Sequence, residues 1–402
     1  MQQSTAPQPI YIHACGLHSA LGSPTDDIRS RLQTGENSNM VLDSHTLNDG
    51  SETIVGRVSH ELPTVPVHLS SYDCRNNQLA ISGLSAIQPQ IINAIKRYGN
   101  ERIAVIIGTS TSGIADGETA FQEKQSTGQF PERFHYSKQE LGNVSEFVSE
   151  YLGVTGPNYS ISTACSSSGR VFLTAKRLLK SGVVDAVVVG GVDTLCKLTL
   201  NGFHSLEALS SSLCQPFGEN RDGINIGEAA AFMLLSLEKP LNESTDPIAL
   251  LGVGDSSDAH HISAPHPDGN GAEQAMLKAL KDAELSPSDI GYINAHGTAT
   301  PLNDSMESKA IHRIFGEKVP VSSTKPVTGH TLGAASAVEA AIAWQILKYN
   351  LDLPLQKTQD KAEDIQVHLV NCSQKLQSKA ILSNSFAFGG NNISLIFGIV
   401  ND

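Results

Sequence analysis

Short apolar segments alternate with helical segments along this chain, and this alternation restricts the possible folds more than any other feature. The run from Ala186 to Gly191 is continuously apolar, which is typical of a strand buried on both faces of a parallel sheet. A helical pattern that ends at about Leu179 precedes it, and another apolar strand is expected at 228–237. Strand, helix and strand therefore follow one another, and this order predicts an α/β protein.

The second part of the chain repeats this order of elements. Strands are expected at 248–253, 290–294 and 319–322, and helices at 272–283, 304–315 and 332–347. A polar run at 242–247 is the best candidate for a boundary. We therefore divide the chain into an N-terminal half, residues 1–243, and a C-terminal half, residues 244–402, and interpret the repeat as an internal duplication.

The length and the charge of the chain exclude several classes of protein. A chain of 402 residues is expected to form two domains or one duplicated unit. Its net charge of −13 argues against nucleic-acid binding, because phosphate binding needs a concentrated basic face. The apolar runs are far shorter than the ~20 residues of a membrane helix, and residues 1–9 carry no secretory signal. We therefore expect a protein without a membrane span.

The cysteines do not follow a metal-binding or disulfide pattern. They are scattered at Cys15, Cys74, Cys165, Cys196, Cys214 and Cys372. No CxxC pair and no Cys/His cluster at zinc-finger spacing is present in the sequence. We expect reduced thiols in a cytoplasmic protein, and no metal site.

Cys165 lies where a strand is expected to turn into a helix. The strand is predicted at 157–163, and apolar residues recur at helical spacing from Val171 to Leu179. The first amides of a helix carry partial positive charge, which favours a thiolate and can hold a developing oxyanion. From this segment alone, a nucleophile and a buried structural cysteine are equally good interpretations.

Two histidines have flanking residues that leave space for a ligand. His296 follows an expected strand, and His330 precedes an expected helix. Each is flanked by Gly and Thr, which provide room and hydroxyl groups. A single such histidine is more often a hydrogen-bonded structural residue. Two of them together with the cysteine favour a catalytic site.

The chain resembles the β-ketoacyl synthases of the thiolase superfamily from Ile10 to Phe397. The matching motifs are the cysteine motif 163–167, the two histidine motifs 296–301 and 325–330, and the glycine pair 389–390. The resemblance implies a duplicated fold of five layers, αβαβα, with two mixed sheets around buried helices. It also implies a 3-oxoacyl-[acyl-carrier-protein] synthase, which is an acyltransferase that forms carbon–carbon bonds.

The resemblance implies a role for each of the main site residues. Cys165 would accept an acyl chain from an acyl carrier protein as a thioester. His296 and His330 would polarise a malonyl thioester, assist the loss of CO2 and stabilise the enolate that attacks the acyl group. Two neutral imidazole N–H groups suit a transition state of that charge. Lys325 would pair with Glu339 and so hold the local charges.

The loop near the C-terminus has a counterpart in the family as well. The backbone amides of Cys165 and Phe388 would form an oxyanion hole. Phe386 and Phe388 match a gating loop that usually has glycine between its aromatic residues. Here Ala387 stands between them, so we expect a somewhat stiffer loop.

The remaining counterparts concern substrate binding and docking. Thr298 and Thr300 match hydroxyl groups that bind the amides of phosphopantetheine. Arg75 lies in the segment that corresponds to the carrier-protein face, and an acidic carrier protein would need a local basic patch there. Three further residues match polar positions near the site of the family, and we expect a supporting structural role for them: Asp258, His261 and Asp304. Since the phosphopantetheine would arrive on the carrier protein, we expect no resident cofactor.

Within the family, four runs of this chain look like the stand-alone ketosynthases of bacterial aryl-polyene pigment clusters. These runs are 75–79, 213–218, 322–331 and 385–392. Such an enzyme would extend an aryl-polyene or its starter by malonyl units. The alternative is a housekeeping fatty-acid ketosynthase, although those have glycine at the position of Ala387 and threonine at that of Asn391.

Two other classes share the fold. A thiolase is expected to carry a second catalytic cysteine near Gly389, where this chain has none. A non-catalytic chain-length factor is expected to have replaced the active cysteine, whereas Cys165 is present. We expect a dimer, either of two identical chains or with a homologous ketosynthase or chain-length factor.

Overall fold

The computed structural model describes residues 8–23, 26–240, 246–378 and 380–400. The strands of the first half are β1 (Ile10–His18), β4 (Ile103–Gly108), β5 (Asn158–Ile161), β6 (Ala186–Asp193) and β7 (Ala229–Ser236), with a separate pair, β2 (Met40–Asp43) and β3 (Thr53–Gly56). The strands of the second half are β8 (Ile248–Ser257), β9 (Ile290–Asn294), β10 (Pro320–Ser322), β11 (His368–Leu369), β12 (Ala380–Phe386) and β13 (Asn391–Ile399). The boundary expected at residue 243 lies outside the described residues.

The two halves have the same strand order. The first half is ordered β5-β4-β6-β7-β1, and the second is ordered β10-β9-β12-β13-β8. In each half the first three strands are parallel, and the remaining pairs are antiparallel. A short antiparallel pairing between β1 and β8, at Ile10 and Tyr11, joins the halves into eleven hydrogen-bonded strands. The repeated order agrees with the expected duplication, and β11 is added outside β10.

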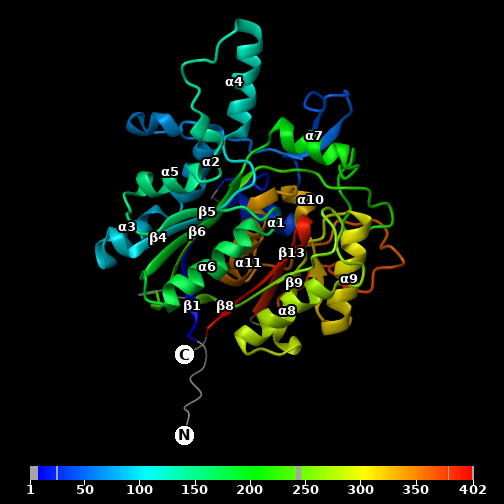
Figure 1. Cartoon of the computed structure of the whole chain (residues 1–402). Coiled ribbons are helices and arrows are strands. Elements are labelled where there is room, and N and C mark those ends of the chain that lie inside the picture. Colours follow the sequence, from blue (N-terminus) through cyan, green and yellow to red (C-terminus); the bar gives the residue numbers. More distant parts are fainter. Residues whose placement is uncertain (1–7, 24–25, 241–245, 379, 401–402) are drawn as a thin grey trace.

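The helices complete five layers (Figure 1). The middle layer consists of α6 (Ser167–Lys180) and α11 (Ala335–Tyr349), which lie between the two halves of the sheet. The outer layer of the first half contains α2 (Arg75–Ser85), α3 (Gln88–Tyr98) and α5 (Asn143–Leu152). The outer layer of the second half contains α8 (Asn270–Ala283) and α9 (Pro301–Phe315). The predicted thiolase-like αβαβα class is therefore confirmed.

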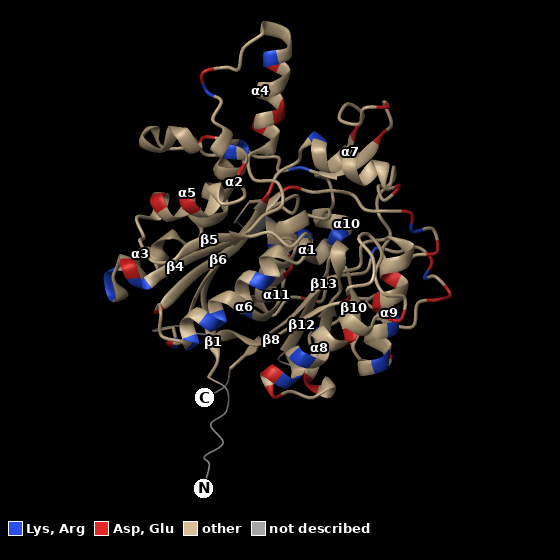
Figure 2. Ribbon diagram, in the orientation of Figure 1, with Lys and Arg blue, Asp and Glu red and all other residues tan. Residues whose placement is uncertain are grey.

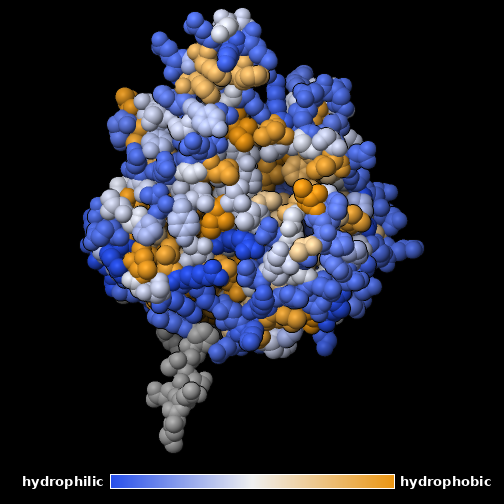
Figure 3. All heavy atoms as spheres, viewed as in Figure 1, coloured by the Kyte–Doolittle hydropathy of each residue, from blue (hydrophilic) through white to orange (hydrophobic). Residues whose placement is uncertain are grey.

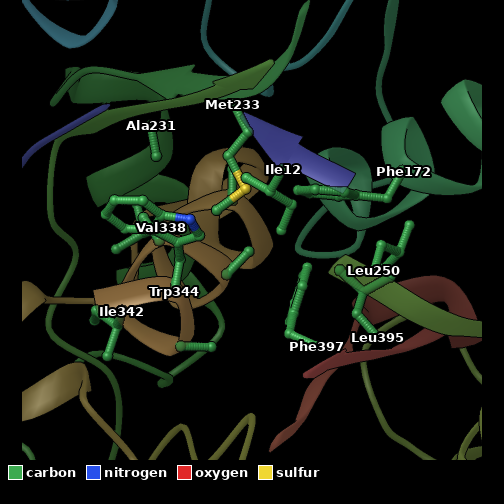
Figure 4. Packing of buried hydrophobic residues seen from close by; sticks show 14 of the residues in the cluster. Ile12, Phe172, Ala231, Met233, Leu250, Val338, Ile342, Trp344, Leu395 and Phe397 are labelled. Atoms are coloured by element: carbon green, nitrogen blue, oxygen red, sulfur yellow. The ribbon is translucent and has the colours of Figure 1, made fainter. Parts of the chain in front are cut away.

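One hydrophobic core surrounds the middle layer. α11 is apolar on almost all sides, as a helix covered by protein on all faces must be. In Figure 4 its residue Val338 lies near Met233 of β7. The rings of Phe172 in α6 and Phe397 in β13 meet edge to face, with centroids 5.7 Å apart. Apolar residues from both halves thus pack into the same core, which holds α6 and α11 in fixed positions.

Shorter elements complete the chain. They are α1 (Asp26–Thr34), α4 (Ile114–Thr127), α7 (Lys197–Ser205) and α10 (Lys325–Thr328), together with several 3-10 turns. α4 protrudes from the body (Figure 1), and acidic and basic residues intermix over the outer helices and loops (Figure 2). Within the described ranges, no helix is long and apolar enough to cross a membrane.

Candidate active site

Cys165 lies in a tight turn between β5 and α6. Ala164 before it has a φ of 53°, a left-handed conformation that is unfavourable for residues other than glycine. Ser166 is the cap of α6, so the thiol lies at the amino end of a buried helix. At Gly108, the end of β4, an added Cβ would lie 2.3 Å from the backbone nitrogen of Ser168. The close approach of β4 therefore requires glycine there and fixes the start of α6.

His330 lies in the turn between α10 and α11 and faces the thiol. Its Nε2 is 3.1 Å from Sγ of Cys165. Its Nδ1 is 3.0 Å from the backbone nitrogen of Leu332, whose N–H donates to it. Because Nδ1 accepts this hydrogen bond, the proton of the neutral imidazole is on Nε2. The ring therefore donates an N–H toward the sulfur.

His296 follows β9, and buried charged side chains hold its backbone on both sides. Its N–H donates to Oε1 of Glu307 at 2.8 Å, and the N–H of Gly297 donates to Oε2 at 2.8 Å. Its carbonyl oxygen accepts a hydrogen bond from Nζ of Lys325. The ring lies perpendicular to that of His330, with centroids 5.3 Å apart. The two imidazoles are therefore fixed side by side next to the thiol.

The ion pair expected between Lys325 and Glu339 is present and buried. Nζ of Lys325 lies 2.6 Å from Oε1 of Glu339, and the two side chains are 2% and 4% exposed. Oε2 of Glu339 accepts a further hydrogen bond, at 3.4 Å, from Oγ of Ser385. Since Nζ also reaches the carbonyl of His296, the pair connects α11 to the histidine loop.

Removal of Lys325 alone should destabilise the protein strongly. In Lys325→Met, Glu339 would remain as an unpaired buried carboxylate, which costs about 3–5 kcal/mol in the free energy of unfolding. The double variant Lys325→Met/Glu339→Gln should recover most of this loss, because the unpaired charge is gone. Urea unfolding measures both effects.

A matched control uses an ion pair between a lysine and a carboxylate at the surface. Nζ of Lys375 lies 2.7 Å from Asp352, and these side chains are 48% and 31% exposed. Lys375→Met should change the free energy of unfolding by less than about 1 kcal/mol. If Lys325→Met and Lys375→Met lost the same free energy of unfolding, the buried pair would not support the site.

The environment sets the ionisation of all three central groups. Burial and the nearby charge of Lys325 hold the pKa of both His296 and His330 well below the usual range, so both rings are neutral at pH 7. Burial raises the pKa of the Cys165 thiol to about 11, against the charge of Lys325 and a hydrogen bond from the backbone of Phe388. The backbone N–H of Cys165 lowers the pKa of the thiol, as expected at the amino end of a helix, but burial has the larger effect and the thiol keeps its proton at rest.

The loop after β12 closes one side of the site. The backbone N–H of Phe388 donates a hydrogen bond to the sulfur of Cys165. This N–H is one of the two expected to form the oxyanion hole. The ring of Phe388 lies 5.7 Å from that of Phe203 in α7, measured between centroids. Ala387 has an ordinary extended backbone, with φ −93° and ψ 151°, so it fits this conformation without strain. The predicted stiffness of the loop stays a prediction.

A cavity of about 270 Å³ opens onto the three central residues. Figure 3 shows apolar side chains gathered near α7, where this face is hollowed. The site residues expected from the sequence that line the cavity are Cys165, Asp258, His296, Thr298, Thr300, His330, Phe386 and Phe388. Within this set, Oγ1 of Thr298 and Oγ1 of Thr300 are 2.8 Å apart. Residues distant in the sequence therefore meet in one chamber.

Cys165, His296 and His330 also satisfy a geometric condition for metal binding, since their ligand atoms all lie within 4.8 Å of one another. However, Nε2 of His330 carries the proton while Nδ1 accepts the N–H of Leu332, so it has no lone pair for a cation. The positive charge of Lys325 acts on both rings as well. The absence of a metal from this site stays a prediction.

Arg75 does not line this cavity. Its guanidinium donates to both carboxylate oxygens of Glu228, at 3.0 and 2.6 Å. Glu228 is buried, whereas the side chain of Arg75 is 42% exposed. The guanidinium is therefore already engaged, and a docking role for it stays a prediction.

Sequence reasoning did not identify Glu307 or Phe203 as site residues. Glu307 accepts the backbone N–H of His296 and so supports the histidine loop. Asp304, which was expected to have a supporting role, accepts the N–H of Thr298 at 3.0 Å. Burial raises the pKa of Glu307 to about 7. The spacing of Glu307 from Asp304 is the sequence signal that could have identified it. The two acidic residues lie three positions apart on the helix after the histidine motif, and residues i and i+3 share a helix face.

A buried thiol that faces two neutral imidazoles, within a duplicated thiolase-like fold, defines the class of this protein as a thiolase-superfamily acyltransferase. The family described as "Beta-ketoacyl synthase, N-terminal domain" matches residues 85–240, and "Beta-ketoacyl synthase, C-terminal domain" matches residues 249–357. The chain belongs to the β-ketoacyl synthase family and catalyses decarboxylative condensation.

Individual relatives agree with this assignment. The chain is 36% identical over 313 residues to 3-oxoacyl-[acyl-carrier-protein] synthase 2 of Staphylococcus aureus, covering 74% of this chain and 77% of the relative. It is 31% identical over 410 residues to the enzyme of the same name from Vibrio harveyi, covering 96% and 98%. Among solved structures, the ketosynthase ApeO in complex with its chain length factor ApeC, from Xenorhabdus doucetiae, is 49% identical with a TM-score of 0.93 and covers 98% of both chains.

Proposed function

We propose that this chain is the catalytic member of a ketosynthase and chain-length-factor pair that extends an aryl-polyenoyl chain on an acyl carrier protein. The observation that carries the proposal is the 49% identity over 98% of the chain to ApeO, which was solved with its chain length factor. The presence of Cys165 with both histidines favours the catalytic member over a chain-length factor. A housekeeping fatty-acid ketosynthase is the alternative.

In the proposed first step, Sγ of Cys165 attacks the thioester carbonyl of the acyl carrier protein. A sulfur–carbon bond forms, the bond to the phosphopantetheine sulfur breaks, and that sulfur leaves with the proton lost by the cysteine. The backbone N–H of Phe388, which reaches Sγ, and that of Cys165 would hold the oxyanion. Because burial raises the pKa of the thiol, Cys165 holds its proton at rest, and this proton must be lost before or during the attack.

In the proposed second step, a malonyl thioester loses CO2, and the electron pair of the broken bond forms an enolate. The Nε2–H groups of His296 and His330 would donate to the enolate oxygen. The fixed tautomer of His330 and the lowered pKa of both rings support this role, because both are then neutral donors. The enolate carbon attacks the acyl carbonyl, the bond between that carbon and Sγ breaks, and Cys165 leaves as a thiolate that takes a proton from water. The products are β-ketoacyl-carrier protein and CO2.

The proposed partner would add to the sheet at β5. This strand ends the sheet order on the N-terminal side, and its residue Tyr159 is 41% exposed. At the opposite end β11 covers β10, so the equivalent edge of the second half is already paired. Pairing at β5 would place the homologous partner close to the turn at Cys165, since β5 leads into that turn.

The proposed reaction needs no resident cofactor, because phosphopantetheine arrives on the carrier protein. Thr298 and Thr300 line the cavity and would bind its amides. We place the reaction in the cytoplasm, and the six free cysteines support that compartment. The net charge of −13 gives no support to a nucleic-acid partner.

The experiment that tests the substrate class uses intact mass spectrometry. The chain, co-expressed with a homologous subunit that lacks the active cysteine, is incubated with carrier protein carrying a cinnamoyl group or a saturated C10 acyl group. We expect faster and more complete gain of the cinnamoyl mass, and co-purification of the two subunits. Preference for the saturated acyl group would favour the housekeeping alternative. If the protein without its partner subunit took up the acyl group at the same rate, the proposal that it needs a partner would be wrong.

A further inference from the structure

The buried carboxylate of Asp193 joins the two halves of the protein beside the candidate site. Asp193 ends β6, and it is 0% exposed. Its Oδ1 accepts four hydrogen bonds of 2.8 Å from the side chains or backbone of residues 109–111, which follow β4. Its Oδ2 accepts a fifth, at 3.0 Å, from the backbone N–H of Ala334 in the second half. One side chain therefore ties the loop after β4 to the start of α11.

The segment that Asp193 holds is a strained turn. Leu332 in this turn has a φ of 52°, which is unfavourable for a leucine and persists only where the surroundings impose it. At Gly333 an added Cβ would lie 2.7 Å from Oγ of Ser110 and 2.8 Å from Oδ2 of Asp193. The turn thus rests directly on the carboxylate, and no side chain fits between them.

This turn also supplies the donor that sets the tautomer of His330. The N–H of Leu332 donates to Nδ1 of His330, and Nε2 of the same ring faces Sγ of Cys165. We propose that Asp193 is a positioning residue for His330: by holding the N–H of Ala334, it keeps the turn in place and the imidazole proton on Nε2. The proposal concerns the known condensation reaction, and its effect on rate rests on the proposed role of His330.

Asparagine is the most informative replacement, because it keeps the shape of the side chain. The five groups that bond to Asp193 are three backbone N–H groups and two threonine hydroxyls, and all five donate to the carboxylate. An amide has one oxygen and one NH2 group. In either orientation Asp193→Asn places the NH2 group against N–H or hydroxyl donors, either at Ala334 or at residues 109–111.

The test measures the tautomer of His330 directly, by NMR of protein with 15N-labelled imidazoles, with His330→Ala used to assign the signal. In the unmodified protein we expect the Nε2–H tautomer alone. In Asp193→Asn we expect a mixture that includes the Nδ1–H form. Decarboxylation of a malonyl-pantetheine thioester should fall about 100-fold in kcat, the effect typical of a small misplacement of a catalytic group.

Thr109→Val is the matched control, because it removes a donor to Oδ1 but leaves the contact of Oδ2 with Ala334. It should retain the Nε2–H tautomer and most of the rate. If Asp193→Asn keeps the tautomer of the unmodified protein, or if Thr109→Val alters it equally, the positioning role is wrong.

Gly333→Ala gives a second route that leaves the carboxylate in place. The new Cβ must displace the turn from Asp193, so the same change of tautomer is expected even if the asparagine variant does not fold. An unchanged tautomer in Gly333→Ala would overturn the proposal. A changed tautomer with an unchanged decarboxylation rate would leave the positioning role intact but would contradict the proposed role of His330.

Discussion

Replacement of Cys165 by alanine is expected to abolish acyl loading and to lower the condensation rate by about 10⁴-fold or more, as removal of a nucleophile does in other covalent catalysts. The thiol lies in the turn before α6, where it lines the cavity, and its sulfur is 3.1 Å from Nε2 of His330. Without Sγ, the proposed mechanism has no atom on which to hold the acyl chain. Intact mass after incubation with acyl-carrier protein measures loading, and the appearance of β-ketoacyl product measures condensation.

Cys214→Ala is the matched control for this variant. Cys214 is also a buried thiol with a raised pKa near the charge of Lys325, but it lies outside the cavity lining. It should load and condense like the unmodified protein. A gain of acyl mass in Cys165→Ala, or condensation at more than a tenth of the normal rate, would show that Cys165 is not the nucleophile.

Replacement of His330 by alanine is expected to lower malonyl decarboxylation by about 10²–10³-fold, the usual effect of removing one oxyanion donor. The reason lies in the fixed tautomer, because Leu332 occupies Nδ1 and leaves Nε2–H to donate. The low pKa of the ring means that this donor is neutral throughout the physiological range of pH. Release of CO2 from a malonyl thioester, followed in single turnovers, separates this effect from acyl loading.

His204→Ala is a suitable control because that ring lies at the surface. Its Nε2 contacts Asp49 at 2.8 Å, and the side chain is 37% exposed. Decarboxylation should be unchanged in this variant. If His330→Ala also decarboxylates at the normal rate, His330 must be removed from the proposed mechanism.

Much of the fold could be predicted because it depends on local periodicity. The continuous apolar run at 186–191 became β6, and the helix expected at 272–283 lies within α8. Apolar spacing over residues 77–95 suggests one helical region, yet the structure has two helices, α2 and α3. Pro89 explains the break, because it lies in the first turn of α3, a position where proline is tolerated, and it could not continue a preceding helix.

The central site residues could also be predicted, because each lies in a short motif with characteristic neighbours. Cys165, His296 and His330 line one cavity, and Lys325 pairs with Glu339. Their ionisation could not be predicted in the same way. The pKa of the thiol depends on how completely the folded chain excludes water around it, and no local pattern records that burial.

The sequence by itself determined the alternation of strands and helices, the duplication and the candidates for the reacting groups, since these depend on residue type and spacing. Only the tertiary structure decided that Asp193 contacts Ala334 across 141 positions, and that burial raises the pKa of the Cys165 thiol. The physical reason is that hydrogen bonds and desolvation depend on distances in space, which become short only when the two halves pack around α6 and α11.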